Sequence, residues 1–140
     1  MSVIDHLEIS VKNAPVSLRF YQQALEPLGF RLVITQEPDK TRTGGFRYGL
    51  GPQGYPRLWL HDNEETGAPL HLAFSADERS IVDEFWKRAI QAGGKDNGAP
   101  GVRKQYHSQY YAAYVFDPDG NNLEVVCLRS TSDNQICVLS

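Results

Sequence analysis

The sequence predicts an α+β fold of two tandem βαβββ modules that form a curved mixed sheet around a cleft. Three observations predict it. The segment at residues 6–10 recurs at 71–75, with histidine, leucine and serine in matching positions. Both segments alternate apolar and polar residues, as strands do. Each is followed by a helical apolar stripe and then by short extended runs between turn residues.

The repeat continues at the same spacing along both halves of the chain. Residues 51–54 resemble residues 117–120 with a slip of one position, and Trp59 falls at the position of Glu124. Matching pairs in the helical stretches are Phe20 with Phe85, Tyr21 with Trp86, and Gly29 with Gly94. An ordered set of matches favours a duplicated module over chance similarity.

The repeat sets the expected domain organisation. A single domain spans residues 1–130, with module 1 at about 1–63 and module 2 at about 68–130. A polar linker at 62–69 joins the modules. Residues 131–140 lie outside the repeat and are expected to be a C-terminal tail.

Helix signals follow the first strand of each module. Asn13 and Pro15 suit the cap and first turn of the first helix. Ser75 and Glu78 fit a capping box for the second helix. Gly93 and its neighbour Gly94 are expected to end it.

Further strands are expected at 31–34, 46–50, 57–61, 111–116 and 122–128. Residues 117–120 read as the turn of a hairpin between the last two. A strand near Val102 is possible. However, Gly98, Pro100 and Gly101 favour a loop for much of 99–110.

Composition narrows the functional classes. A net charge of −3 gives no electrostatic reason to expect nucleic acid or an anionic membrane. The sequence contains neither an apolar run long enough for a membrane span nor a signal-peptide pattern. Two cysteines do not form a disulfide framework, so a cytoplasmic location is expected.

Strand periodicity places three metal-capable side chains opposite the apolar rows of their strands. These are His6 in the first strand, His71 in the first strand of module 2, and Glu124 in the last strand. Two histidines and a carboxylate suit one divalent metal, such as Zn, Ni, Mn or Fe, with open positions for catalysis. The competing interpretation is that these histidines are surface or hydrogen-bonded structural residues.

Trp59 stands where a symmetric site would have a fourth ligand. Because tryptophan cannot bind a metal, we expect it to form an apolar wall that stacks on the substrate. A core aromatic residue is the alternative. His61, on the same face, is a more distant candidate ligand.

Residues 103–111 form the other unusual stretch. Tyr106, Tyr110 and Arg103 are candidate substrate-binding residues. His107 and Tyr111 are candidate catalytic residues for proton transfer, together with Glu124. Alternatively, this stretch is an aromatic loop that packs on a sheet edge or a dimer partner, with Arg103 solvated.

These segments resemble the vicinal oxygen chelate superfamily, which includes glyoxalase I, extradiol dioxygenases, and bleomycin and fosfomycin resistance proteins. Residues 4–7, 20–21, 28–30 and, most specifically, 117–124 carry the resemblance. Residues 96–101 with 110–111 resemble a glyoxalase-like subgroup more than any of the named enzymes.

The resemblance implies that His6, His71 and Glu124 bind a metal that stabilises an oxyanion on a small oxygenated substrate. The reaction would be of lyase, isomerase or dioxygenase type. Glyoxalase I has a glutamate where this chain has Trp59, so its isomerisation is not implied. The family also implies a homodimer. A non-catalytic drug- or metabolite-binding protein of bleomycin-resistance type is the alternative, and a vestigial fold kept for protein interaction is a third.

Overall fold

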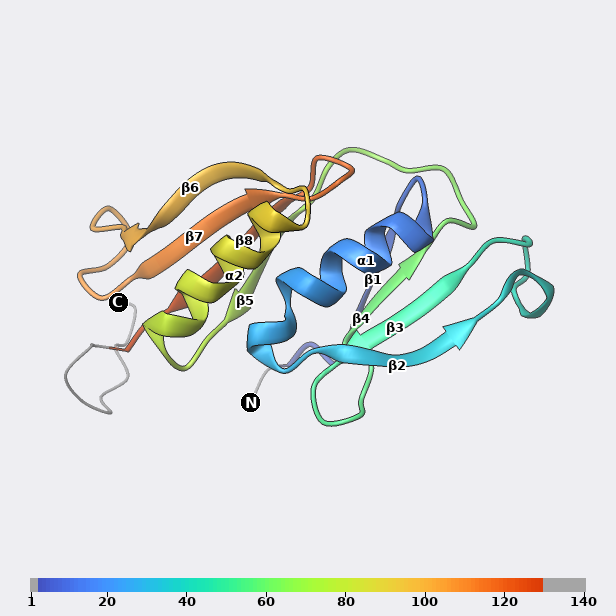
Figure 1. Cartoon of the computed structure of the whole chain (residues 1–140), viewed down its shortest axis with the longest axis horizontal. Helices are drawn as coiled ribbons and strands as arrows, with labels where there is room; N and C mark the ends of the chain where they lie inside the picture. The colour runs from blue at the N-terminus through green and yellow to red at the C-terminus, as the bar shows by residue number, and fades with distance from the viewer. Residues whose placement is uncertain (1–2, 130–140) are drawn as a thin grey trace. The chain divides into compact units, whose positions relative to one another are not determined.

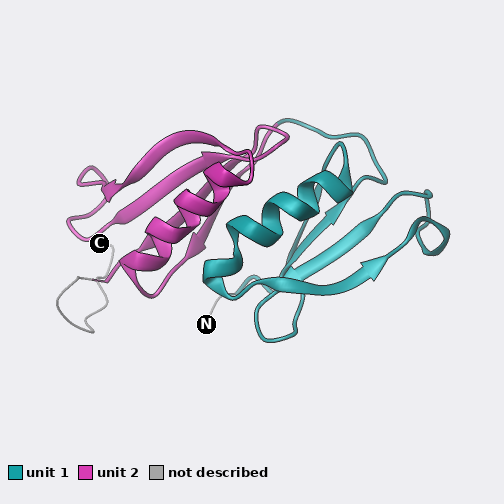
Figure 2. Ribbon diagram, viewed as in Figure 1, with its two compact units in different colours: residues 1–68 teal, residues 69–140 magenta. Residues whose placement is uncertain are grey.

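A computed structural model describes residues 3–129 of the chain, which form two compact units. Unit 1 spans Met1–Ala68 and unit 2 spans Pro69–Ser140 (Figure 2). The tail expected at 131–140 lies outside the described residues. No helix in residues 3–129 is long and apolar enough to cross a membrane.

Unit 1 is a four-stranded mixed sheet with one long helix across one of its faces (Figure 1). Its strands lie in the order β1-β4-β3-β2, with β1 parallel to β4 and the other pairs antiparallel. Its elements in chain order are β1 (Leu7–Ser10), α1 (Ala14–Ala24), η1 (Glu26–Leu28), β2 (Arg31–Gln36), η2 (Pro38–Lys40), β3 (Arg47–Gly51) and β4 (Leu58–His61).

Unit 2 repeats this arrangement with its strands in the order β5-β8-β7-β6. Here β5 is parallel to β8, and the remaining pairs are antiparallel. Its elements are β5 (His71–Ser75), α2 (Arg79–Gln91), β6 (Lys95–Val102), β7 (Tyr111–Phe116) and β8 (Asn122–Cys127). The shared βαβββ order and shared strand order confirm the predicted α+β fold of two similar modules.

Each unit has its core between its helix and its sheet. Apolar strand residues alternate with polar ones, so every second side chain is buried under the helix. In unit 1 the buried residues include Phe20, Tyr21, Leu25, Leu50, Leu58 and Leu60. In unit 2 they include Val82, Phe85, Ala89, Val115, Leu123 and Val125. The opposite face of each sheet, here called its open face, therefore carries the intervening polar side chains.

The two helices begin differently. In α1 the side chain of Asn13 accepts a hydrogen bond from the backbone N–H of Val16 at 3.1 Å, as predicted. The predicted capping box of Ser75 and Glu78 is wrong. Ser75 is paired with Val126 in the sheet, and Glu78 takes the cap position without a side-chain cap bond. The strand therefore runs to the residue that the pattern assigned to the helix start.

Strand β6 differs from the expected loop. It runs through Pro100 because it is an edge strand, where a missing backbone N–H can be tolerated. The pairing of β6 with β7 shifts register on both sides of Gly98, whose φ is 148°. A Cβ on Gly98 would lie 2.9 Å from the Tyr114 ring. Turn-forming residues here mark irregular pairing rather than the absence of a strand.

Candidate functional site

Glu124 lies on the open face of the unit 2 sheet. Its neighbours Leu123 and Val125 are fully buried in the core, and the alternation of β8 turns Glu124 away from α2. Glu124 is nevertheless only 2% exposed, because side chains from β5, from β7 and from the loop between β6 and β7 cover it. A carboxylate buried this deeply requires polar partners.

His71 is one of those partners. Its Nε2 lies 3.1 Å from Oε1 of Glu124, and its Nδ1 lies 3.0 Å from the backbone oxygen of Asn122. Since a carbonyl oxygen only accepts, Nδ1 carries a proton and donates to Asn122. In the neutral ring Nε2 then presents a lone pair to the carboxylate. Two acceptors this close are compatible only with a proton or a cation between them.

The turn between β7 and β8 fixes this pair. Asp117 accepts hydrogen bonds from the backbone N–H groups of Asp119 and Asn121 at 2.9 and 2.8 Å. The buried Asn121 side chain donates to Asp117 and accepts from the N–H of Leu70, both at 2.8 Å. Leu70 directly precedes His71. The turn therefore ties the start of β5 to the start of β8 and sets the positions of His71 and Glu124.

Tyrosines complete the surroundings of Glu124. The Tyr110 hydroxyl donates to Oε2 of Glu124. Burial, followed by this bond and the charge of Glu124, raises the pKa of Tyr110 far above its ordinary value. Burial and Glu124 also raise the pKa of Tyr114, whose ring stacks on His71 with centroids 6.5 Å apart. Any phenol is protonated at neutral pH, and the raised pKa values of Tyr110 and Tyr114 extend that state to higher pH.

Two other predicted substrate-binding residues lie beside this cluster. The Tyr106 ring is 5.0 Å from the Tyr110 ring and 60% exposed. The Arg103 guanidinium lies 5.3 Å from the centre of the Tyr114 ring and donates to the backbone oxygen of Ala99 at 2.7 Å. The structure thus brings Arg103, Tyr106 and Tyr110 together around the His71–Glu124 pair.

The predicted catalytic residues His107 and Tyr111 are placed differently. His107 lies in the loop after β6 and accepts a hydrogen bond from the N–H of Gln109 at 3.1 Å. Tyr111 faces α2, where its hydroxyl donates to Asp83 at 2.6 Å. Burial, then Asp83, raises the pKa of Tyr111 to about 12. The sheet therefore lies between the Tyr111 side chain and Glu124.

His6 lies just before β1 in unit 1, with its side chain 54% exposed. Its Nδ1 is 2.7 Å from the carboxylate of Asp5. The Tyr55 hydroxyl donates to the same carboxylate at 2.7 Å, and Arg57 lies beside it. These bonds, from Tyr55 first and His6 second, lower the pKa of Asp5. An ionised Asp5 orients the ring so that Nε2 is the nitrogen left to bind a ligand.

Trp59 is covered by Arg47, a residue that the sequence patterns did not single out. The Arg47 guanidinium lies 3.7 Å from the centre of the Trp59 ring. It also donates to both carboxylate oxygens of Glu8, at 2.7 and 3.3 Å. The only sequence signal for it was its place near the start of the strand expected at 46–50. The open face of unit 1 therefore presents charge where an apolar wall was expected.

A pocket of about 640 Å³ opens next to this arginine, within unit 1. Its lining is polar throughout and comes from β1, β2, β3, β4, η2 and the loops that follow η2 and β4. The lining residues are Glu8, Ser10, Gln36, Lys40, Thr41, Arg42, Thr43, Arg47, His61, Asn63 and Glu64. His61 lies 3.3 Å from the Ser10 hydroxyl through its Nε2. Sequence patterns did not indicate this pocket, since its walls come from distant segments.

Residues 3–129 contain no group of three or more His, Cys, Asp or Glu side chains that could hold a metal ion. Within unit 2 the predicted ligands form the pair of His71 and Glu124, and His6 belongs to unit 1.

Comparisons with known proteins agree with this architecture. The model of the Glyoxalase/Bleomycin resistance protein/Dioxygenase superfamily matches residues 3–125. The chain is 30% identical over 122 residues to "Metallothiol transferase FosB" of Shouchella clausii, covering 87% of this chain and 77% of that protein.

Solved structures show the same fold. A glyoxalase/bleomycin resistance protein from Albidiferax ferrireducens has a TM-score of 0.68 and 25% identity, with 92% of this chain and 100% of that chain covered. A glyoxylase/bleomycin resistance protein/dioxygenase domain from Frankia has a TM-score of 0.71 and 18% identity, with 92% and 99% covered. The chain belongs to the Glyoxalase/Bleomycin resistance protein/Dioxygenase superfamily.

Proposed function

We propose that this protein is a metal-dependent enzyme acting on a small oxygenated substrate, with His6, His71 and Glu124 as the metal ligands. The observation that carries the proposal is the 3.1 Å approach of His71 Nε2 to the buried Glu124 carboxylate. A divalent cation satisfies both groups at once, since a neutral imidazole and a carboxylate are each ligands in their own right.

The surroundings of the two histidines also fit a metal. Histidines that bind metals commonly donate their other ring N–H to a carboxylate or a backbone carbonyl, which fixes the tautomer. His71 does so to the carbonyl of Asn122, and His6 does so to the carboxylate of Asp5. In both residues Nε2 is the nitrogen left to coordinate. Two nitrogens and a carboxylate suit Zn, Ni, Mn or Fe.

The bound metal would supply Lewis-acid stabilisation of negative charge on a substrate oxygen. The chain's own residues would bind and orient that substrate on the open face of the unit 2 sheet. Tyr110 and Tyr106 offer hydroxyl donors there, and Arg103 offers a positive charge. We leave Tyr111 out because its hydroxyl faces Asp83 beneath the helix.

The likeness to a metallothiol transferase supports a metal-dependent reaction of this kind. We propose lyase, isomerase or dioxygenase chemistry for this chain, in keeping with the families that share its fold. The homodimer, the cytoplasmic location and the module boundaries near residues 63 and 68 stay predictions.

Elemental analysis of the purified, tag-free protein tests the proposal. We expect about one equivalent of a transition metal per chain, and its loss in His71→Ala. His107→Ala is the matched control, since it removes a histidine that is not among the proposed ligands and should keep the metal. A parent protein that contains no metal and takes up no Fe, Mn, Ni or Zn at micromolar concentrations would contradict the proposal.

A second candidate function is non-catalytic binding of a drug or metabolite. The cluster of Tyr106, Tyr110 and Tyr114 around one sheet face favours it, because aromatic rings hold flat ligands without chemistry. In that case a metal-free parent should gain thermal stability with a bound ligand, and Tyr106→Ala should remove the gain. A ligand-dependent shift that requires added metal would favour the enzyme instead.

A further inference from the structure

We propose that Arg57 and Tyr55 are positioning residues, which hold Asp5 so that His6 presents its Nε2 to the proposed metal. This inference rests on the proposed function, because it takes His6 as a metal ligand. Arg57 and Tyr55 belong to the connection between β3 and β4, and both contact Asp5 within unit 1. Neither was among the site residues predicted from the sequence.

Arg57 holds the chain on both sides of His6. His6 lies one residue before β1, so its own backbone is outside the paired strand. The backbone oxygen of Arg57 accepts a hydrogen bond from the N–H of Leu7 at 2.8 Å, and its Nη1 donates to the backbone oxygen of Asp5 at 2.8 Å. One residue therefore fixes the two peptide groups that flank the histidine.

The carboxylate of Asp5 is held at both of its oxygens. Oδ1 lies 2.7 Å from the Tyr55 hydroxyl and 2.7 Å from Nδ1 of His6, and Oδ2 lies 3.3 Å from Nη1 of Arg57. Because an ionised carboxylate only accepts, Nδ1 of His6 carries a proton and donates it to this bond. The neutral ring then has its lone pair on Nε2, the nitrogen that a metal would bind.

The bond between Asp5 and His6 needs this support because it is exposed. The two side chains are 57% and 54% exposed, and a single exposed contact exchanges readily with water. Arg57 and Tyr55 restrict the carboxylate to one orientation. They also hold each other, since the guanidinium lies 4.4 Å from the centre of the Tyr55 ring.

The turn that carries Tyr55 is itself fixed. The N–H of Tyr55 donates to the backbone oxygen of Pro52 at 3.1 Å, and the N–H of Arg57 donates to that of Leu50 at 2.9 Å. A Cβ on Gly51 would collide with the backbone oxygen of Tyr55, so glycine is required where the chain passes this closely. The two side chains therefore start from a rigid backbone.

The matching turn of unit 2 supports its histidine through different bonds. Residues 51–54 and 117–120 are equivalent in the repeat. Directly after the second of these segments, the Asn121 side chain accepts from the N–H of Leu70, the residue before His71. In each module the turn before the last strand thus holds the residue that precedes a proposed ligand histidine.

Three variants test the positioning role. Arg57→Met removes the donors but keeps an unbranched side chain, and Tyr55→Phe removes the hydroxyl but keeps the ring. Arg57→Lys is the rescue variant, because one nitrogen of Arg57 makes both bonds to Asp5 and a single ammonium can replace it.

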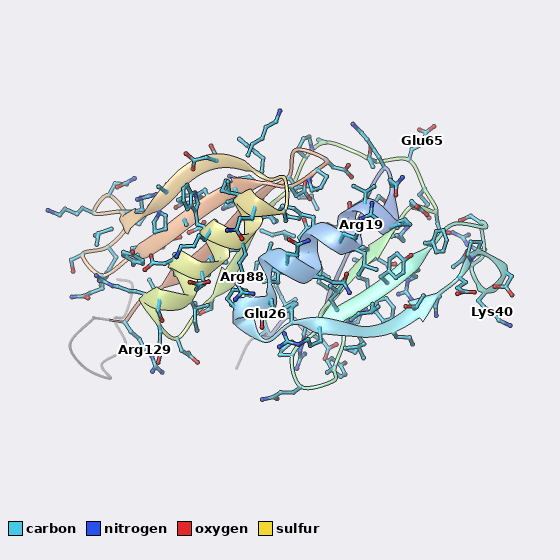
Figure 3. The ribbon with its side chains drawn as sticks, in the orientation of Figure 1. Arg19, Glu26, Lys40, Glu65, Arg88 and Arg129 are labelled. Atoms are coloured by element: carbon cyan, nitrogen blue, oxygen red, sulfur yellow. The ribbon has the colours of Figure 1, made fainter. Side chains whose placement is uncertain are left out.

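Two control variants remove contacts of the same kind elsewhere. Arg31→Met removes a guanidinium that donates to the backbone oxygen of Phe30 at 2.9 Å and to Glu26 at 3.1 Å. Figure 3 labels Glu26 beyond the end of α1. Tyr111→Phe removes a tyrosine–aspartate hydrogen bond, to Asp83 in unit 2. Neither contact involves a proposed metal ligand.

The tautomer of His6 in the metal-free protein is the first measurement. Nitrogen-15 NMR at a pH where the histidines are neutral distinguishes the two tautomers, and His6→Gln identifies the His6 signals among the four histidines. We expect the parent and both controls to carry the proton on Nδ1. In Arg57→Met and Tyr55→Phe the signals should move toward a mixture of the two tautomers, and Arg57→Lys should stay close to the parent.

The affinity for Zn²⁺, measured by competition with a coloured chelator, is the second measurement. Groups that orient a metal-binding histidine commonly change metal affinity by tenfold or more. We therefore expect binding to weaken about tenfold in Arg57→Met and in Tyr55→Phe. Arg57→Lys and the two controls should bind Zn²⁺ as the parent does.

Three outcomes would overturn the positioning role: a His6 tautomer that is unchanged in both positioning variants, equal losses of affinity in Arg57→Met and Arg31→Met, or tighter Zn²⁺ binding in Tyr55→Phe. The last would show that the hydroxyl only draws charge away from Asp5. A parent that takes up no Zn²⁺ would count against the metal proposal instead, and the tautomer of the metal-free protein would still decide whether Arg57 and Tyr55 orient His6.

Discussion

The side chains of His71 and Glu124 meet at 3.1 Å but differ sharply in their access to water. The His71 side chain is 50% exposed, whereas that of Glu124 is 3% exposed. A carboxylate removed from water requires its hydrogen-bond donors, whereas an exposed imidazole can exchange one partner for another. The pair is thus fixed on the Glu124 side and accessible to solvent on the His71 side.

Among the donors to Glu124, Tyr110 should have the largest effect on stability when it is removed. Tyr110→Phe leaves one oxygen of the buried Glu124 with one donor fewer. We expect the free energy of unfolding to fall by about 1–3 kcal/mol. Urea denaturation measures this change.

Tyr106→Phe is the matched control, because Tyr106 is 60% exposed and only its ring approaches Tyr110. In a Glu124→Gln background the Tyr110→Phe substitution should cost less, by at least about 0.5 kcal/mol, since the charged acceptor is gone. Equal losses in the two tyrosine variants would show that the hydroxyl bond to Glu124 does not stabilise the fold.

Arg47 should control the acid sensitivity of unit 1. The bond from Arg47 is the main cause that lowers the pKa of Glu8 below 4.5. Because this pKa is depressed, the stabilisation is present above the unfolded pKa and is lost as pH falls through the folded one. Arg47→Met should therefore move the Glu8 pKa back toward 4.5 and flatten the loss of stability in acid.

NMR titration of the Glu8 carboxyl carbon, with denaturation followed between about pH 3 and 6, measures both effects. Arg31→Met is the control, because it breaks a different arginine–glutamate pair, with Glu26. A Glu8 pKa that is unchanged in Arg47→Met would mean that another group depresses it.

The open faces were predictable because strand alternation is a local rule. It placed His71 and Glu124 opposite the buried Leu123 and Val125 without any knowledge of the fold. The same rule applied to β7 places Tyr111 and Tyr114 on opposite faces of the sheet, so the predicted catalytic role of Tyr111 beside Glu124 conflicts with it. The alternation of residues 111–116 is therefore enough to place Tyr111 on the helix-covered face.

The contacts of long side chains could not be predicted in this way. Arg47 reaches Trp59 on one neighbouring strand and Glu8 on the strand beyond it, which requires the strand order β1-β4-β3. The polar pocket likewise depends on Asn63 bonding to a loop far away in the sequence. Such contacts arise from topology and register, which a single sequence specifies only weakly.

The Tyr111 hydroxyl should lose its proton at a higher pH than an ordinary tyrosine. Burial and the bond to Asp83 raise its pKa to about 12. Because this pKa is raised, the stabilisation is fully present below the ordinary value of 10.0 and is lost as pH rises through the folded value. Ultraviolet titration of the phenolate should lose one late step in Tyr111→Phe.

Asp83→Asn tests the role of the charge. It keeps an acceptor for the Tyr111 hydroxyl but removes the repulsion of the phenolate, so the late step should move to lower pH. Burial remains, so we expect the pKa to stay above 10.0. A late step that is unaffected by either substitution would have to belong to another tyrosine.

Asn121 should act on the proposed metal site from a distance. Its buried amide joins Asp117 in the turn to the N–H of Leu70, the residue before His71. Asn121→Ala removes both bonds, and we expect the free energy of unfolding to fall by about 1–3 kcal/mol. It should also weaken metal binding, because the start of β5 loses its tie to β8 and His71 is no longer held against Glu124.

Competition with a coloured chelator would measure the metal affinity, and urea denaturation the stability. The control is Asn13→Ala, which removes the cap of α1 in unit 1 and should lower stability by about 1 kcal/mol. Metal affinity should fall in Asn121→Ala and hold in Asn13→Ala. If the two variants lose metal affinity in proportion to their lost stability, the turn supports the fold in general and does not position His71.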